Sequence, residues 1–238
     1  MKTIYIDEVG CSPIAGPVVV CAVALADGEI KVPGVRDSKK LSRSQRDNLF
    51  KTLSKLEHEY AYASPELIIE KNVFWAKFHA MKEAVEKLLA RGIRANKVIV
   101  DGNFTIKDLD MEQEAVIKAD DKFWQVGAAS ILAKVTRDNM MEEFGKQKVY
   151  SYYDWKSNAA YPAPKHRIGV TLFGPTDLHR KNFAVYQYYM FHHEECNRFI
   201  KEGKTAQEYF EWIDSVKGGK NTLSNLVRWK DGLFGGWR

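Results

Sequence analysis

The sequence has few cysteines, no long apolar run and no strong net charge. Its three cysteines, Cys11, Cys21 and Cys196, lack the paired spacing of a disulfide framework or a zinc site. The longest apolar run, residues 17–26, is about half the roughly 20 residues that a membrane-spanning helix needs, and the N-terminus has a strand pattern in place of a basic signal region. We therefore expect a cytoplasmic protein with reduced thiols and no membrane contact.

The charge balance and the length set the broad class. Lysine and arginine exceed aspartate and glutamate by 36 − 31 = 5, a mild excess that is compatible with a polyanionic partner. With 238 residues, of which 45% are apolar, the chain can build an ordinary globular core. We expect a main domain over residues 1–202 and a helical or partly ordered appendage over residues 203–238.

Alternating strand and helix patterns predict an α/β fold. The expected strands are residues 2–6, 17–25, 59–63, 97–100 and 115–118. The expected helices are residues 43–57, 73–91, 126–144 and 176–201, the first of them with Ser42 as its N-cap. Residues 150–173 are rich in Tyr, Pro, Lys and His, and we expect them to form an ordered functional loop.

Four acidic residues lie at or just past the ends of predicted strands: Asp7, Glu8, Asp101 and Asp120. Carboxylates held close together raise each other's pKa and stay ionised when a cation neutralises them. An all-oxygen set favours Mg²⁺ or Mn²⁺ over zinc, and a pair of such ions can hydrolyse phosphodiesters. On spacing alone a nucleotidyltransferase or another metal phosphatase fits equally well, and a purely structural role for the acids stays open.

Ordered sequence blocks resemble one known family over residues 1–190. The blocks are Tyr5 to Gly10, Pro13 to Val19, Asp37 to Ser42, Val100 to Asn103, Lys118 to Asp120, Ala128 to Asp138, Tyr161 with His166, and His179 to Phe183. Together they resemble the type 2 ribonucleases H, the ribonuclease HII family, and residues 128–138 are the most specific part of the match.

This resemblance implies an RNase H-like mixed β-sheet flanked by helices, with a C-terminal helical region that closes over a nucleic-acid groove. It also implies an endonuclease that cuts the RNA strand of RNA–DNA hybrids, and the 5′ side of ribonucleotides embedded in duplex DNA, leaving 5′-phosphate and 3′-hydroxyl ends. Two Mg²⁺ or Mn²⁺ ions and a monomeric enzyme are expected with it.

Carried over by position, the resemblance assigns roles to individual residues. Asp7, Glu8, Asp101 and Asp120 would bind the metal ions, and Asp138 would help to hold the second ion, unless it only pairs with Arg137 or Lys134 along its helix. Tyr161, with His166, would stack on the sugar after the ribonucleotide, or else be a surface packing residue. The candidates for phosphate contact, any of which could instead be merely solvated, are Lys39, Lys40, Arg46, Lys165, Arg180 and Lys181.

One loop departs from the family pattern. Where the family has Gly-Arg-Gly or Gly-Lys-Gly to grip the 2′-hydroxyl and phosphate of the ribonucleotide, this chain has Gly10-Cys11-Ser12. Cys11 supplies no positive charge, and Ser12 would be strained by about 1 kcal/mol or more in a glycine geometry. Ala159-Ala160 also replaces a position where glycine is common.

These changes predict cleavage of hybrids with a weaker preference for single ribonucleotides. The alternatives are a broader, structure-specific nuclease of the same fold and a catalytically silent protein that binds hybrids.

Overall fold

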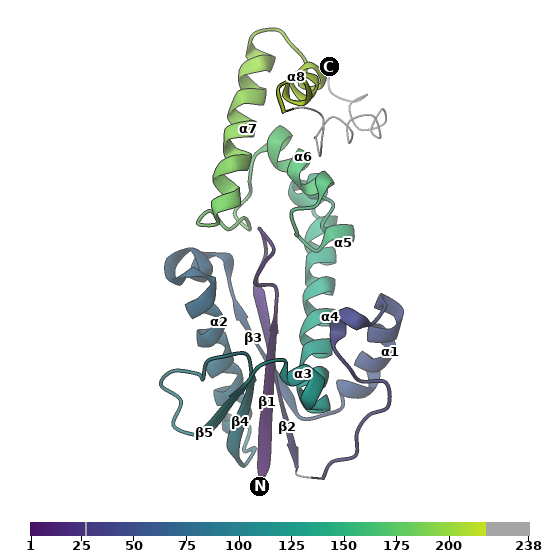
Figure 1. Ribbon diagram of the computed structural model, residues 1–238, viewed down its shortest axis with the longest axis vertical. Coiled ribbons are helices and arrows are strands. Elements are labelled where there is room, and N and C mark those ends of the chain that lie inside the picture. Colours follow the sequence, from purple (N-terminus) through teal and green to yellow (C-terminus); the bar gives the residue numbers. More distant parts are fainter. Residues whose placement is uncertain (27, 218–238) are drawn as a thin grey trace. The chain divides into compact units, whose positions relative to one another are not determined.

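The computed structural model describes residues 1–26 and 28–217, which form two compact units (Figure 1). The first unit comprises Met1–Ser12 and Gly16–Met140, and the second comprises Pro13–Ala15 and the chain from Met141 onward. The main domain over residues 1–202 stays a prediction, as does the appendage, of which residues 218–238 lie outside the described residues.

A five-stranded mixed sheet in the order β3-β2-β1-β4-β5 forms the first unit. The strands are β1 (Lys2–Val9), β2 (Val18–Ala26), β3 (His58–Ala63), β4 (Ala95–Asp101) and β5 (Glu112–Val116). The central strand β1 runs antiparallel to β2 and parallel to β4, which in turn is parallel to β5. Every predicted strand is present, and the predicted mixed sheet with flanking helices is confirmed.

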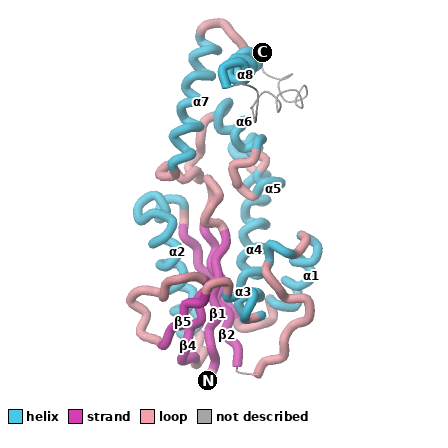
Figure 2. The backbone as a smooth tube through the Cα atoms, in the orientation of Figure 1, coloured by secondary structure: helices cyan, strands magenta, loops and turns pink. Residues whose placement is uncertain are grey.

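Helices cover both faces of this sheet, with α2 (Pro65–Ala90) on one side and α4 (Trp124–Lys146) on the other (Figures 1 and 2). Alternate side chains of a strand point to opposite faces, so both faces of β1 and β2 can be buried. Tyr5 and Cys21 pack with Ala128 and Ala129 of α4 in one core, where these small helical residues allow close approach to the sheet. Because the sheet is packed on both faces, the positions of the side chains at the ends of its strands are fixed.

Helix α2 contains an internal break at Asn72, whose φ and ψ are 61° and 165°. The Asn72 side-chain Oδ1 accepts hydrogen bonds from the amides of Phe74 at 3.0 Å and Trp75 at 3.2 Å. Asn72 therefore caps the part of α2 that follows it. The predicted helix of residues 73–91 corresponds to this second part, and the prediction missed the first turns after Ser64.

The other elements of the first unit are η1 (Ser38–Lys40), α1 (Arg43–Leu53) and α3 (Ala119–Lys122). Ser42 caps α1 as predicted and forms a capping box with Gln45. The prediction of a helix to residue 57 is wrong, because Leu53 is buried at the end of α1 and the chain then turns into β3.

The second unit contains η2 (Lys148–Tyr153), α5 (Trp155–Asn158), α6 (Pro164–Phe173), α7 (Ala184–Lys201) and α8 (Ala206–Lys217). The prediction of a loop over residues 150–173 is wrong, because this stretch forms short helices. The buried side chains of Tyr150, Tyr153 and Trp155 pack these helices around a core. Helix α7 begins at Ala184, not at residue 176. No helix in the two described ranges is both long and apolar enough to cross a bilayer.

Candidate functional site

Asp7 and Glu8 are adjacent in β1 but face different helices. Asp7 is 7% exposed and interacts with the Ser130 hydroxyl of α4. Glu8 Oε1 lies 2.9 Å from Lys77 Nζ of α2. This split follows from the alternation of side chains along a strand. The acidic pair therefore connects the end of β1 to both helical layers of the first unit.

Asp101 and Asp120 join Asp7 at the same end of the sheet. The parallel register pairs Ile6 with Val100, so the next residues in the two strands are Asp7 and Asp101. Asp101 Oδ1 accepts a hydrogen bond from the Ala119 amide at 2.7 Å, which ties β4 to the start of α3, where Asp120 lies. The structure thus brings the three aspartates into one neighbourhood.

The electrostatics of these acids show that their charges are crowded. Burial, then Glu8 and Asp101, raise the pKa of Asp7 well above its usual value. Burial, followed by Asp101 and Asp37, also raises the pKa of Asp120. Removal from water and like charges both disfavour ionised carboxylates, so a bound cation would stabilise this arrangement.

The oxygen donors here fit a hard divalent cation. Glu8 Oε2 is buried without a hydrogen-bond partner, and an unsatisfied buried carboxylate oxygen is unusual. Carboxylate oxygens are the ligands that Mg²⁺ and Mn²⁺ prefer. Within residues 1–26 and 28–217, however, no three His, Cys, Asp or Glu side chains are grouped closely enough to hold one ion. The four-carboxylate ligand set stays a prediction.

Asp138 lies on α4 and is held by two basic side chains of the first unit. Its Oδ1 lies 2.7 Å from Lys134 Nζ, which is the helical ion pair that the sequence left open, and its Oδ2 lies 3.9 Å from Arg46 Nη2. Arg46 also donates to the carbonyl oxygens of Ser38 and Leu41 at 3.0 Å and 2.6 Å. In this arrangement Arg46 and Asp138 connect the loop before α1 to α4.

The loop Gly10-Cys11-Ser12 requires glycine at its first position. Gly10 has a φ of 103°, and a Cβ there would lie 2.3 Å from Nε of the buried Arg137. The Cys11 Sγ lies 3.6 Å from Glu8 Oε1. Ser12 has no positive φ, so the backbone strain expected there is absent.

Two alanines of the second unit also have positive φ angles. Ala159 has a φ of 46° and Ala160 a φ of 64°, a region that favours glycine. These residues directly precede Tyr161, whose amide bonds to the Asn158 carbonyl at 2.9 Å. The strain expected at Ser12 is therefore found beside the predicted stacking tyrosine.

Tyr161 is 40% exposed, whereas His166 is fully buried beneath it. The His166 Nδ1 bonds to the Tyr161 carbonyl at 3.0 Å, and its Nε2 accepts from Trp155 Nε1 at 3.1 Å. His179 Nε2 lies 3.0 Å from the same His166 nitrogen. Burial lowers the pKa of His166 to about 4 and that of His179 to about 3. This neutral network holds the backbone that presents Tyr161.

The predicted phosphate contacts differ in their surroundings. Lys39 and Lys181 are exposed. Lys40 lies 2.7 Å from Asp121 and Lys165 lies 3.0 Å from Asp154, both as ion pairs. Arg180 is fully buried and donates to the Pro13 carbonyl at 2.8 Å, so its position is that of a residue that fixes the backbone.

Lys77 is the residue of this site that sequence reasoning missed. It occupies the helical stripe of Phe74, Phe78 and Met81, at the spacing that buries apolar side chains. A lysine in such a stripe indicates an acidic partner, and here that partner is Glu8.

Comparison with known proteins identifies the family. The ribonuclease HII family model matches residues 4–188. The chain belongs to the ribonuclease HII family. A ribonuclease HII from Anaplasma phagocytophilum is 40% identical over 183 residues, which cover 75% of this chain and 84% of that protein. The family assignment makes the chain a hydrolase of the ribonuclease H type.

Two solved structures share the fold of this chain. Ribonuclease H2 from Pyrococcus horikoshii matches with a TM-score of 0.62 and 27% identity, covering 82% of this chain and all of that one. Bst-RNase HIII, solved in complex with Mn²⁺, matches with a TM-score of 0.64 and 18% identity, covering 82% of this chain and 71% of that one. The second likeness concerns the fold alone.

Proposed function

We propose that this ribonuclease HII family member is a metal-dependent endonuclease that hydrolyses the RNA strand of RNA–DNA hybrids at the ends of β1 and β4. The observation that carries this proposal is the buried, crowded position of Asp7: burial, then the charges of Glu8 and Asp101, raise its pKa well above the usual value. Such crowding opposes folding unless it serves a bound cation. A protein that only bound hybrids would gain nothing from carboxylates beside phosphates.

Asp7, Glu8, Asp101 and Asp120 would hold two Mg²⁺ or Mn²⁺ ions. When bound, such ions supply an activated water and stabilise the leaving oxygen of the phosphodiester. The Ala119 amide holds Asp101, and Ser130 orients Asp7. The expected products are a 5′-phosphate and a 3′-hydroxyl.

Recognition of a single ribonucleotide is weakened in this proposal. The loop Gly10-Cys11-Ser12 has no basic side chain, and the Cys11 thiol lies against Glu8. Tyr161 keeps an exposed ring for stacking on a sugar, while His166 and Arg180 act as positioning residues from the interior. Exposed or surface-paired lysines, Lys39, Lys40, Lys165 and Lys181, would contact phosphates.

The decisive experiment compares the wild-type protein with Asp101→Asn on an RNA–DNA hybrid, with Mg²⁺ and with Mn²⁺. Asp101→Asn should lose at least about 100-fold in cleavage rate, because even residues that only support metal ligands contribute 10- to 100-fold. Asp47→Asn, an exposed change on α1, is the matched control and should cleave normally. Unchanged cleavage by Asp101→Asn would refute the assigned site.

Substrate choice is tested on matched DNA, RNA and hybrid duplexes and on a DNA duplex with one ribonucleotide. The proposal requires cleavage of the hybrid and slower cleavage at the single ribonucleotide. Equal, efficient cleavage at both would contradict the weakened recognition. Cleavage of plain DNA would indicate the broader nuclease, and binding without cleavage would indicate a silent protein.

A further inference from the structure

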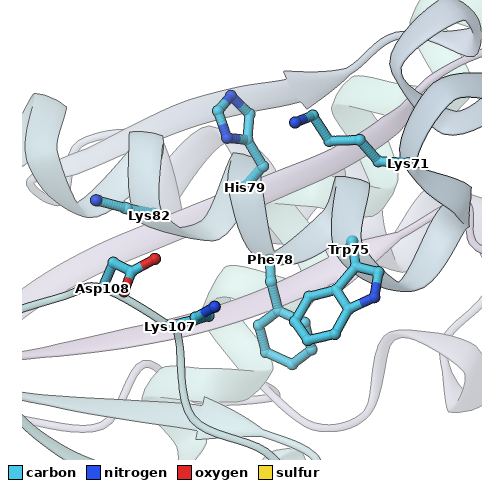
Figure 3. Close-up of a pocket in the computed structure, with 7 residues that line it drawn as sticks. All are labelled: Lys71, Trp75, Phe78, His79, Lys82, Lys107 and Asp108. Atoms are coloured by element: carbon cyan, nitrogen blue, oxygen red, sulfur yellow. The ribbon is translucent and has the colours of Figure 1, made fainter.

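A hollow of about 420 Å³ opens beside α2 in the first unit (Figure 3). Trp75, His79 and Lys82 line it from one face of α2, at positions i, i+4 and i+7. Lys107 lines it from the loop that follows β4. We call the set Lys71, Trp75, His79, Lys82, Phe104 and Lys107 the aromatic-lysine patch.

Exposed aromatic rings are the first notable property of this patch. Trp75 is 50% exposed and Phe104 is 56% exposed. Phe74 holds both in edge-to-face contact, with ring centroids 5.0 Å from Trp75 and 5.3 Å from Phe104. Contiguous exposed apolar surface marks interaction sites, and flat aromatic faces suit stacking against a planar partner.

The excess of positive charge in the patch indicates an anionic partner. Lys71, Lys82 and Lys107 line the hollow, against one acid, Asp108. Lys71 and Lys82 each lie 3.7 Å from an exposed glutamate, pairs that contribute little in water. Lysine is depleted in protein–protein interfaces, whereas lysines beside aromatic rings are typical of single-strand nucleic-acid grooves. The complementary partner is therefore a polyanion with planar groups.

The patch also lies close to the proposed catalytic carboxylates. Phe104 follows Asp101 by three residues, so their Cα atoms are at most about 11 Å apart. This distance is about three nucleotide steps of a duplex strand at roughly 3.4 Å each. On α2, Trp75 stands two residues before Lys77, which pairs with Glu8. A strand held at the carboxylates can reach the patch within a few nucleotides.

We propose that the aromatic-lysine patch binds an unpaired nucleotide of the substrate, a few nucleotides from the scissile bond. The base stacks against the rings of Trp75 and Phe104, and the neighbouring phosphates contact the lysines. This site rests on the proposed function for its substrate, but its residues are separate from the carboxylates. It gives the enzyme a preference for hybrids that adjoin single-stranded nucleic acid.

The test measures binding of fluorescent hybrids by anisotropy, with the full chain carrying Asp101→Asn to prevent cleavage. One hybrid is blunt, and two others carry a single-stranded extension on either side. In that background, Trp75→Ala and Phe104→Ala should each weaken binding of one extended hybrid by about tenfold, since a stacked base contributes about 5- to 150-fold. Binding of the blunt hybrid should change less than twofold.

Two matched substitutions control for aromatic and charge loss. Phe191→Ala removes a ring that is 56% exposed, as Phe104 is, but lies outside the patch. Lys107→Glu should lower the number of ions released on binding of the extended hybrid by about one, whereas Lys55→Glu, in the exposed turn after α1, should not. Urea unfolding should show that each variant keeps the parent's stability.

The outcomes separate this site from the proposed function. Equal binding of extended and blunt hybrids by the parent, or equal losses on both in Trp75→Ala, would overturn the patch. Failure of the wild-type protein to cleave a blunt hybrid would overturn the function, whatever the extensions do. Loss confined to the extended hybrid supports the patch.

Discussion

Lys77→Met removes the ammonium that lies 2.9 Å from Glu8 Oε1 and keeps an unbranched side chain next to Phe78. The side chains of Lys77 and Glu8 are 17% and 16% exposed, so water screens the pair only in part. A hydrogen bond to a charged group contributes about 1.5–3 kcal/mol, and breaking a fully buried pair removes about 3–5 kcal/mol. We expect the metal-free variant to lose about 2 kcal/mol of unfolding free energy at neutral pH.

The same substitution should strengthen binding of a divalent cation. The Lys77 ammonium and a metal ion would compete for the Glu8 carboxylate, so Lys77 stabilises only the metal-free protein. A difference of about 2 kcal/mol corresponds to about 30-fold in affinity, because 1.4 kcal/mol is tenfold. Mg²⁺ should therefore stabilise Lys77→Met at about 30-fold lower concentration than it stabilises the wild type.

Urea unfolding followed by circular dichroism, first in EDTA and then across a Mg²⁺ titration, measures both effects without any cleavage assay. Lys82→Met is the control on the same helix, since its 3.7 Å pair with Glu86 is exposed and should contribute less than about 0.5 kcal/mol. The reasoning fails if Lys77→Met is as stable as wild type in EDTA, or if both proteins respond to the same Mg²⁺ concentration.

Three further changes test other parts of the structure. Ala159→Gly should raise the unfolding free energy by about 0.5–1 kcal/mol in urea titrations, because glycine relieves the φ of 46°; no gain would mean that the strain is absent. Gly10→Ala should lower it by about 3 kcal/mol, because its Cβ meets Arg137 at 2.3 Å, and a loss below about 1 kcal/mol would contradict this. Folding lowers the pKa of His166 from its ordinary value near 6.5 to about 4, so below pH 6.5 the unfolded chain binds more protons than the folded chain does. Stability should therefore fall as pH drops from 6.5, by about 3 kcal/mol from this residue at pH 4, and NMR should show the His166 and His179 rings still neutral at pH 5.

The sheet was predictable from sequence because its signals are local. Apolar strands buried on both faces read as continuous runs, as residues 18–25 do, and Ser42 marks the start of α1 through a capping box. The acids Asp7 and Asp101 could be placed at one end of the sheet because each follows an apolar run predicted to be a strand, although β1 extends past Asp7 to Val9. What the pattern could not supply was the pairing of Glu8 with Lys77, which depends on α2 covering that face of the sheet.

Helices α5 and α6 of the second unit were not predictable, for a different reason, whereas α7 was predicted with too early a start. Helix α5 has four residues, too few to show a helical period. Its stability comes from Trp155, which stacks on Tyr150 and Tyr153 and donates to His166. Those contacts join residues brought together only by folding. Backbone strain was expected at Ser12 and occurs instead at Ala159 and Ala160, the second place where the sequence departs from the glycine common in the family.

The cap that Asn72 forms inside α2 has a consequence for how this chain can vary. Because Asn72 restarts the helix through the amides of Phe74 and Trp75, the rotational phase of Lys77 and Trp75 is set locally. An inserted residue between Ser64 and Asn72 would turn the first part of the helix by about 100° and leave the second part in phase. The part of α2 before Asn72 can therefore change in length while the Lys77 ammonium keeps its contact with Glu8.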